Sequence, residues 1–225
     1  MSLTDAEFEA KQSELANLRR KSSELEAEIL EAATVDPFRL TGFYTMYYAT
    51  TGFMLGLVAA AMSLLVNVIG APIVGKSPLE IIRIYLTFPL GERALAVTGP
   101  TQIYAVDNGV ILACGVCLYL ITGMFLGVPV HVILARFTTK ASTGARMVFA
   151  AAIGIILWAI MYYGILSWLQ PMVCGGSWIT DGEDLPPWVA AGTHVVFAIS
   201  MVVLYPLGLF APYQRPTEEG SAAEG

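Results

Sequence analysis

Residues 108–135 read NGVILACGVCLYLITGMFLGVPVHVILA and contain no Asp, Glu, Lys or Arg. An α-helix rises 1.5 Å per residue, so about 20 apolar residues cross the hydrocarbon core of a bilayer. Uncharged stretches of similar length occupy residues 40–75, 147–180 and 185–214. The whole chain is 56% hydrophobic and 13% charged, with a mean hydropathy of +0.66, which excludes an ordinary soluble domain.

The sequence therefore predicts an all-α, polytopic membrane protein with four transmembrane helices within residues 37–213. We expect these helices at about 43–67, 108–135, 147–169 and 188–210. Between the first two, residues 77–93 read SPLEIIRIYLTFPLGER, with Glu80, Arg83 and Thr87 at helical spacing among apolar residues. This pattern predicts an interfacial helix that lies in the membrane plane.

Residues 1–36 are charged throughout and predict a cytoplasmic amphipathic helix, whereas residues 214–225 predict a disordered tail. A heptad register places mostly apolar residues along one stripe of this helix, and we expect the partner contact at Phe8, Leu15, Leu18, Leu25 and Ile29. Lys11 and Ser22 interrupt the stripe. The helix is either solvated, on its own protein or on the membrane surface, or it pairs with another chain as a coiled coil.

The distribution of basic residues predicts the orientation. The link between the second and third transmembrane helices carries Arg136, Lys140 and Arg146, whereas the link between the third and fourth carries only acidic charges. Basic loops stay cytoplasmic, so both termini are expected inside. The N-terminal segment lacks the apolar core and cleavage site of a secretory signal, and the chain has no nucleic-acid signature.

Two similar hexapeptides, TGFMLG at residues 51–56 and TGMFLG at 122–127, place G-x-x-x-G pairs in the first two transmembrane helices. Small residues at this spacing let helix backbones approach closely. We therefore expect Gly52, Gly56, Gly123 and Gly127 to be helix-packing residues. An inverted repeat, as in many transporters, is the alternative origin of the pair.

Two histidines are the candidate cofactor ligands. His131 lies near the cytoplasmic end of its helix, where we expect it to reach water and to have a structural role, whereas His194 lies deeper in the fourth helix. Their depths differ by roughly 15 to 20 Å in this topology, which is too far for one haem iron to bind both. Haem completed by a partner subunit, or a quinone at one histidine, is the redox alternative.

No catalytic or metal-binding motif is present. Cys114 and Cys117 form a C-x-x-C inside an apolar helix and are expected to be packing residues, while Cys174 is a candidate for a disulfide with Cys114. Three acidic residues between 181 and 184 lack the spacing of a calcium loop. The chain is therefore not expected to be an enzyme, and no cofactor is predicted.

The stretches ILWAIMYYGILSWLQP (156–171) and PPWVAAGTHVVFAISMVVLYP (186–206) resemble the last two helices of small, uncharacterised four-helix bacterial membrane proteins. The resemblance covers roughly the membrane half, implies the bacterial inner (plasma) membrane and supplies no activity. We expect a non-catalytic accessory or scaffold subunit of a larger, respiratory or otherwise energy-transducing, membrane complex. Its partners are lipid and other membrane subunits or a second copy, and a small homo-oligomeric transporter or permease is the alternative.

Overall fold

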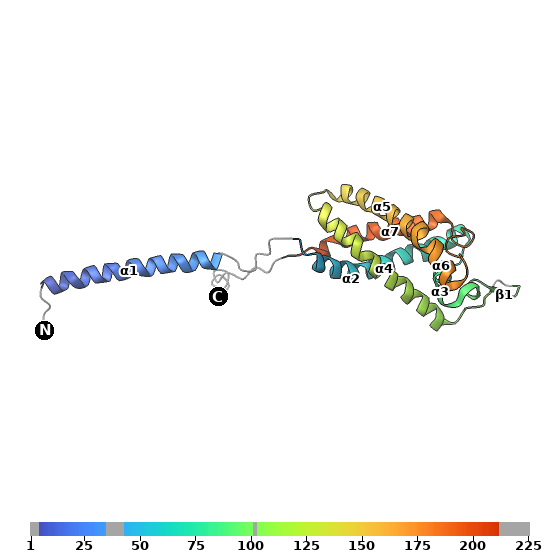
Figure 1. The fold of residues 1–225 in the computed structure, drawn as a ribbon, viewed down its shortest axis with the longest axis horizontal. Coiled ribbons are helices and arrows are strands. Elements are labelled where there is room, and N and C mark those ends of the chain that lie inside the picture. Colours follow the sequence, from blue (N-terminus) through green and yellow to red (C-terminus); the bar gives the residue numbers. More distant parts are fainter. Residues whose placement is uncertain (1–4, 35–42, 101–102, 212–225) are drawn as a thin grey trace. The chain divides into compact units, whose positions relative to one another are not determined.

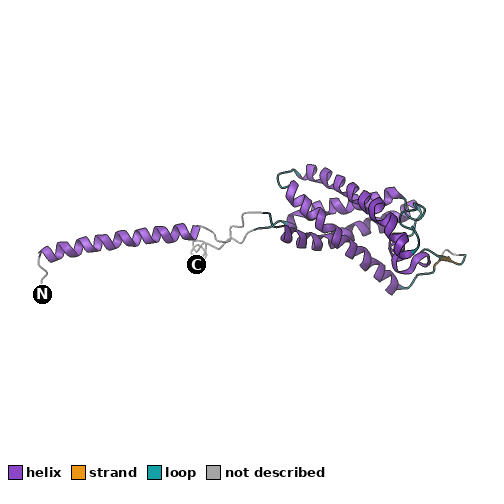
Figure 2. Ribbon diagram, in the orientation of Figure 1, coloured by secondary structure: helices purple, strands orange, loops and turns teal. Residues whose placement is uncertain are grey.

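The computed structural model describes residues 5–34, 43–100 and 103–211. It divides into two compact units, of which one contains the N-terminal helix α1 (Asp5–Thr34) and the other is a helical bundle over Phe43–Phe210. Helices make up most of the described chain (Figure 2). The predicted tail, residues 214–225, lies outside the described residues, as does the boundary expected at residues 36 and 37.

The side chains of helix α1 are exposed along its described length. Every side chain described between Lys11 and Ile29 is exposed, including the apolar residues of the expected stripe. Leu15, Leu18, Leu25 and Ile29 are 51% to 65% exposed. The side chain of Phe8, the other residue expected at this contact, lies outside the described residues.

Within the residues that the structure describes, four helical segments are long and apolar enough to cross a membrane, which makes this a multi-pass membrane protein and confirms the predicted number of transmembrane helices. They begin with α2 (Thr45–Gly70), α4 (Gly109–Phe137), α5 (Thr143–Ala159) and α7 (Pro187–Leu204). In Figure 1, α2 lies beside α4, α5 lies beside α7, and α2 contacts α7. The third segment continues from α5 through a π-helical turn, Ile160–Leu166, into α6 (Ser167–Cys174).

Local sequence explains where these helices begin and end. The side chains of Asn108 and Ser142 accept hydrogen bonds from the first-turn amides of α4 and α5, as N-cap residues do. A short 3₁₀ turn, Ala71–Val74, follows α2 and contains Pro72, and another, Tyr205–Gly208, follows α7 and contains Pro206. Proline lacks the amide proton that a continuing helix needs.

The glycines of the two hexapeptides face each other across α2 and α4. A Cβ added at Gly52 would lie 2.8 Å from the carbonyl oxygen of Gly127, and one added at Gly56 would meet the carbonyl of Gly123. The helices therefore run antiparallel, with residues 51–56 packed against 122–127. This face is occupied within the chain and is closed to a partner.

Helix α3 (Glu80–Leu90) forms between α2 and α4 and packs against α4 and α6. Gly91, at φ +60°, ends it in a backbone conformation that side chains rarely adopt, and a 3₁₀ turn (Gly91–Ala94) and a two-stranded ribbon, β1 (Val97–Thr98) with β2 (Ile103–Tyr104), follow. The helix appears where the sequence predicts one. Its polar face differs from the expectation for an interfacial helix, because Arg83 and Thr87 are buried by other parts of the chain.

Candidate functional site

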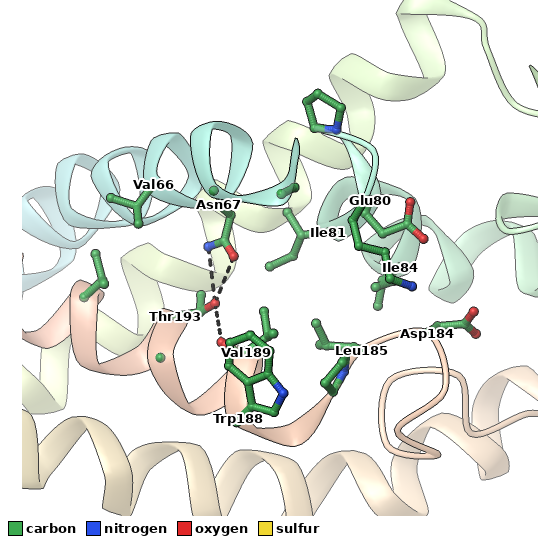
Figure 3. Close-up of a pocket in the computed structure, with 17 residues that line it drawn as sticks. Val66, Asn67, Glu80, Ile81, Ile84, Asp184, Leu185, Trp188, Val189 and Thr193 are labelled. Carbon is green, nitrogen blue, oxygen red and sulfur yellow. Dashed lines mark hydrogen bonds between the residues drawn. The ribbon is translucent and has the colours of Figure 1, made fainter. Parts of the chain in front are cut away.

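Two neighbouring cavities lie between α2, α3, α4, α7 and the loop that precedes α7. The larger, of about 450 Å³, is lined by the end of α2, the start of α3 and the start of α7 (Figure 3). The smaller, of about 290 Å³, lies among α3, α4, the π-helical turn and α7. Ile81, Leu185 and Thr193 line both cavities and so form the wall between them.

The larger cavity is apolar along its length and polar at its ends. Asn67 and Thr193 hydrogen bond to each other, 3.2 Å between Nδ2 and Oγ1, whereas the carboxylates of Glu80 and Asp184 lie toward the other end (Figure 3). Lys76 also lines this cavity. An elongated apolar molecule with a hydrogen-bonding group at each end matches this arrangement.

A chain of hydrogen bonds fixes the Asn67–Thr193 end. The Tyr119 hydroxyl on α4 donates to Ser63 Oγ (3.3 Å), and Ser63 Oγ on α2 donates to the Thr193 carbonyl (2.9 Å) on α7. Asn67 Nδ2 also donates to the Ser63 carbonyl, and the Thr193 hydroxyl donates to the Val189 carbonyl. Because lipid offers no hydrogen bonds, these polar groups hold three transmembrane helices together at the Asn67–Thr193 end of the larger cavity.

A buried cation, Arg83, organises the side chains around Glu80, at one end of the larger cavity. Arg83 stacks 3.7 Å from the centre of the Tyr104 ring, donates to Ser77 Oγ (2.8 Å) and lies 3.7 Å from Asp107. Tyr104 in turn donates to Glu80 (2.7 Å). Burial, with this hydrogen bond and the charge of Glu80, raises the pKa of Tyr104 to about 12, so the phenol stays protonated and holds Glu80 in place.

Negative charge is concentrated around Asp184. Burial raises the pKa of the Asp184 carboxyl, and the charges of Asp181 and Glu80 raise it further, whereas Lys76 lowers it. This end of the larger cavity therefore carries a carboxyl group that takes up a proton more readily than an exposed aspartate does.

Gln170 positions the loop that carries Asp184. It is fully buried on α6, where its Nε2 donates to Thr87 Oγ1 (2.8 Å) and its Oε1 accepts from the Ile179 amide (2.9 Å). A single side chain thus joins α6, α3 and the loop over residues 175–186. Leu185, at the end of that loop, packs into the apolar cluster with Ile84 and Ile179.

The structure separates the two histidines into different surroundings. His194 lines the smaller cavity, and its Nδ1 lies 2.8 Å from the Ala190 carbonyl, so Nδ1 carries the proton and Nε2 is left as an acceptor. His131 lines neither cavity. It is fully buried, with Nε2 3.3 Å from the Gly208 carbonyl and its ring beside those of Tyr48 and Tyr205.

The expectation that His131 reaches water is therefore wrong. The 3₁₀ turn after α7 folds over the histidine, and a Cβ added at Gly208 would collide with the imidazole. The approach of Gly52 from α2 closes the other side, where an added Cβ would lie 2.7 Å from the His131 Cβ. Two glycines thus make the room for this side chain, which packs within the fold.

The cysteines and the acidic loop show no assembled site. Cys114, Cys117 and Cys174 are free thiols, and the Cys174 thiol lies 3.4 Å from the Phe88 carbonyl, not in a bridge to Cys114. Among the residues that the structure describes, no three His, Cys, Asp or Glu side chains are grouped to hold a metal ion.

Sequence reasoning missed the polar residues that line the larger cavity or hold its surroundings in place. Gln170, Asn67 and Ser63 each lie inside an apolar run, and a polar residue in such a run was the signal that could have found them. Their partners come from distant parts of the chain, which the local pattern does not reveal. Comparison of the chain with protein-family models, with curated proteins and with solved structures found no match.

Proposed function

We propose that this protein is a membrane-embedded accessory or scaffold subunit that joins a larger assembly through α1. The observation that carries the proposal is the apolar stripe of α1, whose Leu15, Leu18, Leu25 and Ile29 are at least half exposed. A helix with leucines in a heptad pattern gains stability when a second helix covers them. The bundle supplies the membrane anchor, and α1 supplies the contact.

The packing of the bundle supports this division of roles. The glycine face, which is the close-contact surface that the sequence offers, joins α2 to α4 inside one chain. The large apolar residues exposed on the bundle, such as Phe125 and Val148, suit contact with lipid chains. The heptad spacing of the stripe on α1, in contrast, suits contact with another helix.

The test is to purify the full chain gently from its native membrane and to compare two double variants. Leu18→Lys with Leu25→Lys places charges in the stripe, whereas Ser13→Lys with Ala27→Lys places the same charges on the opposite face of α1. We expect a stoichiometric partner, either another subunit or a second copy, to be lost from the first variant and kept by the second. Equal recovery from both variants would refute the proposal.

A second candidate, a small transporter or permease, is favoured by the two cavities and by the π-helical turn beside the smaller one, since such turns often mark functional sites. Gly192 lines the larger cavity with no atom within 4 Å of an added Cβ, so Gly192→Leu would fill it. Gly144→Leu, which lies outside both cavities, is the control.

Native mass spectrometry of the chain released from nanodiscs would test this candidate. A small molecule retained by the wild type and by Gly144→Leu, but not by Gly192→Leu, would establish the site. Flux of that molecule into liposomes containing the pure protein would then establish transport, and equal retention by all three proteins would exclude the larger cavity.

A further inference from the structure

We propose that the partner of α1 is the α1 helix of a second copy, paired with it in parallel and in register as a two-stranded coiled coil. This inference rests on the proposed function, because it names the occupant of the same stripe. The core positions would be Leu15, Leu18, Ser22, Leu25 and Ile29, which follow the alternating spacing of three and four residues.

The charges that flank the stripe identify the partner. Glu14 and Lys21 precede the core positions Leu15 and Ser22, whereas Arg19 and Glu26 follow the core positions Leu18 and Leu25. In a parallel pair, each preceding residue meets the following residue five positions later on the partner. Glu14 would then meet the partner's Arg19, and Lys21 would meet the partner's Glu26, so all four pairs in the dimer are attractive.

These flanking charges are available for such pairs. The ion pair that the described part of α1 makes is Arg20 with Glu24, at 3.8 Å, and it lies on the side of the helix away from the stripe. Glu26 accepts a 3.3 Å hydrogen bond from Ser22, which keeps the carboxylate beside the stripe. The side chains of the four flanking residues, Glu14, Arg19, Lys21 and Glu26, are exposed.

The antiparallel pair that aligns residues 11–29 with the same residues of the partner would be repulsive. Aligning the core residues end to end would place Lys21 opposite the partner's Lys21, Arg19 opposite the partner's Arg19, and Glu14 opposite the partner's Glu28. A shift of one heptad would pair Arg19 with the partner's Glu26 and Lys21 with the partner's Glu28, so this shifted antiparallel pair is attractive as well. Like charges therefore select against the unshifted antiparallel pair. Cysteine cross-linking distinguishes the parallel pair from the shifted antiparallel one.

Connectivity favours the same arrangement. α1 ends at Thr34 and the bundle begins at Phe43, so copies inserted in the same orientation carry their helices on the same side of the membrane. Confinement of both copies to one bilayer raises their effective concentration, which compensates for a short stripe.

Cysteine cross-linking of the full chain in membranes tests the register. In a background where Cys114, Cys117 and Cys174 are alanine, Leu18→Cys should form a disulfide dimer under mild oxidation, because parallel in-register helices place residue 18 opposite itself. Ala27→Cys, on the opposite face, is the matched control and should give at least tenfold less. A dimer that requires Leu18→Cys on one copy and Ile29→Cys on the other would show the shifted antiparallel pair and overturn the proposal.

A charge swap tests the pairing itself. Arg19→Glu turns two attractive pairs into repulsive ones and should lower the yield of the Leu18→Cys dimer roughly tenfold. Adding Glu14→Arg should restore the yield. Rescue by Glu26→Arg of a cross-link between Leu18→Cys on one copy and Ile29→Cys on the other would identify the antiparallel pair. An unchanged yield of the Leu18→Cys dimer with Arg19→Glu alone would overturn the parallel assignment.

The mass of the wild-type chain, purified in mild detergent, distinguishes this inference from the proposed function. A dimer that Leu18→Lys with Leu25→Lys converts to a monomer supports both. A monomer that holds another membrane subunit through the stripe overturns self-pairing and leaves the accessory role standing. A monomer with no partner that depends on α1 overturns both.

Discussion

Gly127→Ala tests whether the contact between α2 and α4 holds the bundle together. The added methyl would lie 2.6 Å from the Gly56 Cα and 3.0 Å from the Gly56 amide nitrogen, and would also meet the Gly52 carbonyl oxygen. Carbon atoms rest about 3.5 to 4.0 Å apart, so the two helices must separate locally by about 1 Å. The atoms in the way belong to the backbone of α2, which cannot rotate aside as a side chain can.

The expected loss of stability is about 2 kcal/mol. Overpacking a tight contact costs about 1 to 3 kcal/mol, and the upper end applies because backbone faces backbone. Replacing glycine by alanine within a helix returns about 1 kcal/mol. The free energy of unfolding would be measured by titrating the micellar protein with sodium dodecyl sulfate.

The matched control for this measurement is Gly192→Ala, a mid-helix substitution in α7 where an added Cβ meets nothing within 4 Å. It should leave the free energy of unfolding unchanged or raise it by up to about 1 kcal/mol. If the control behaves in this way and Gly127→Ala unfolds within about 0.5 kcal/mol of the wild type, the close contact is not a determinant of stability.

Three further substitutions probe the cavity region by the same titration. Gln170→Leu removes the acceptor of the buried Ile179 amide and should cost about 1 to 3 kcal/mol, with faster hydrogen exchange at that amide. Burial raises the pKa of Tyr104 from its ordinary value of 10 to about 12, so the stability that Tyr104 confers is complete below pH 10 and is lost as the pH rises toward 12. The free energy of unfolding of Tyr104→Phe should therefore lack this loss between about pH 9 and 11.5. The pKa of Asp184 is raised by burial, so its ionisation opposes folding as the pH rises above 4, and Asp184→Asn should gain stability relative to the wild type at pH 7 but not at pH 3.

The transmembrane helices could be predicted from the sequence because lipid imposes a length and a composition. The second helix was expected at residues 108–135 and forms at Gly109–Phe137, since Asn108 caps its start and the uncharged run ends at Arg136. The third helix begins a few residues before the expected residue 147, because Ser142 is the N-cap. Both boundaries depend on side chains that act within one turn of the chain.

The surroundings of His131 and α3 could not be predicted in the same way, because they depend on segments distant in the sequence. His131 was expected to reach water from its position along α4, yet Gly208 and Tyr205, after α7, cover it. Arg83 and Thr87 give α3 the pattern of a surface helix. Both are buried because Tyr104 and Gln170 come from other elements to cover them.

The polar residues of the bundle divide according to whether their hydrogen bonds are complete within the chain. Gln170 is fully buried, with Thr87 and the Ile179 amide as partners, so its role is to hold α3 and the loop in place. Asn67 and Thr193 are only partly buried and line a cavity whose other lining is mostly apolar. A membrane protein with only a scaffolding role would be more stable with this space filled, because a cavity forfeits packing. The larger cavity is therefore the feature of the bundle that an accessory role through α1 leaves unexplained, and the comparison of Gly192→Leu with Gly144→Leu separates the two roles.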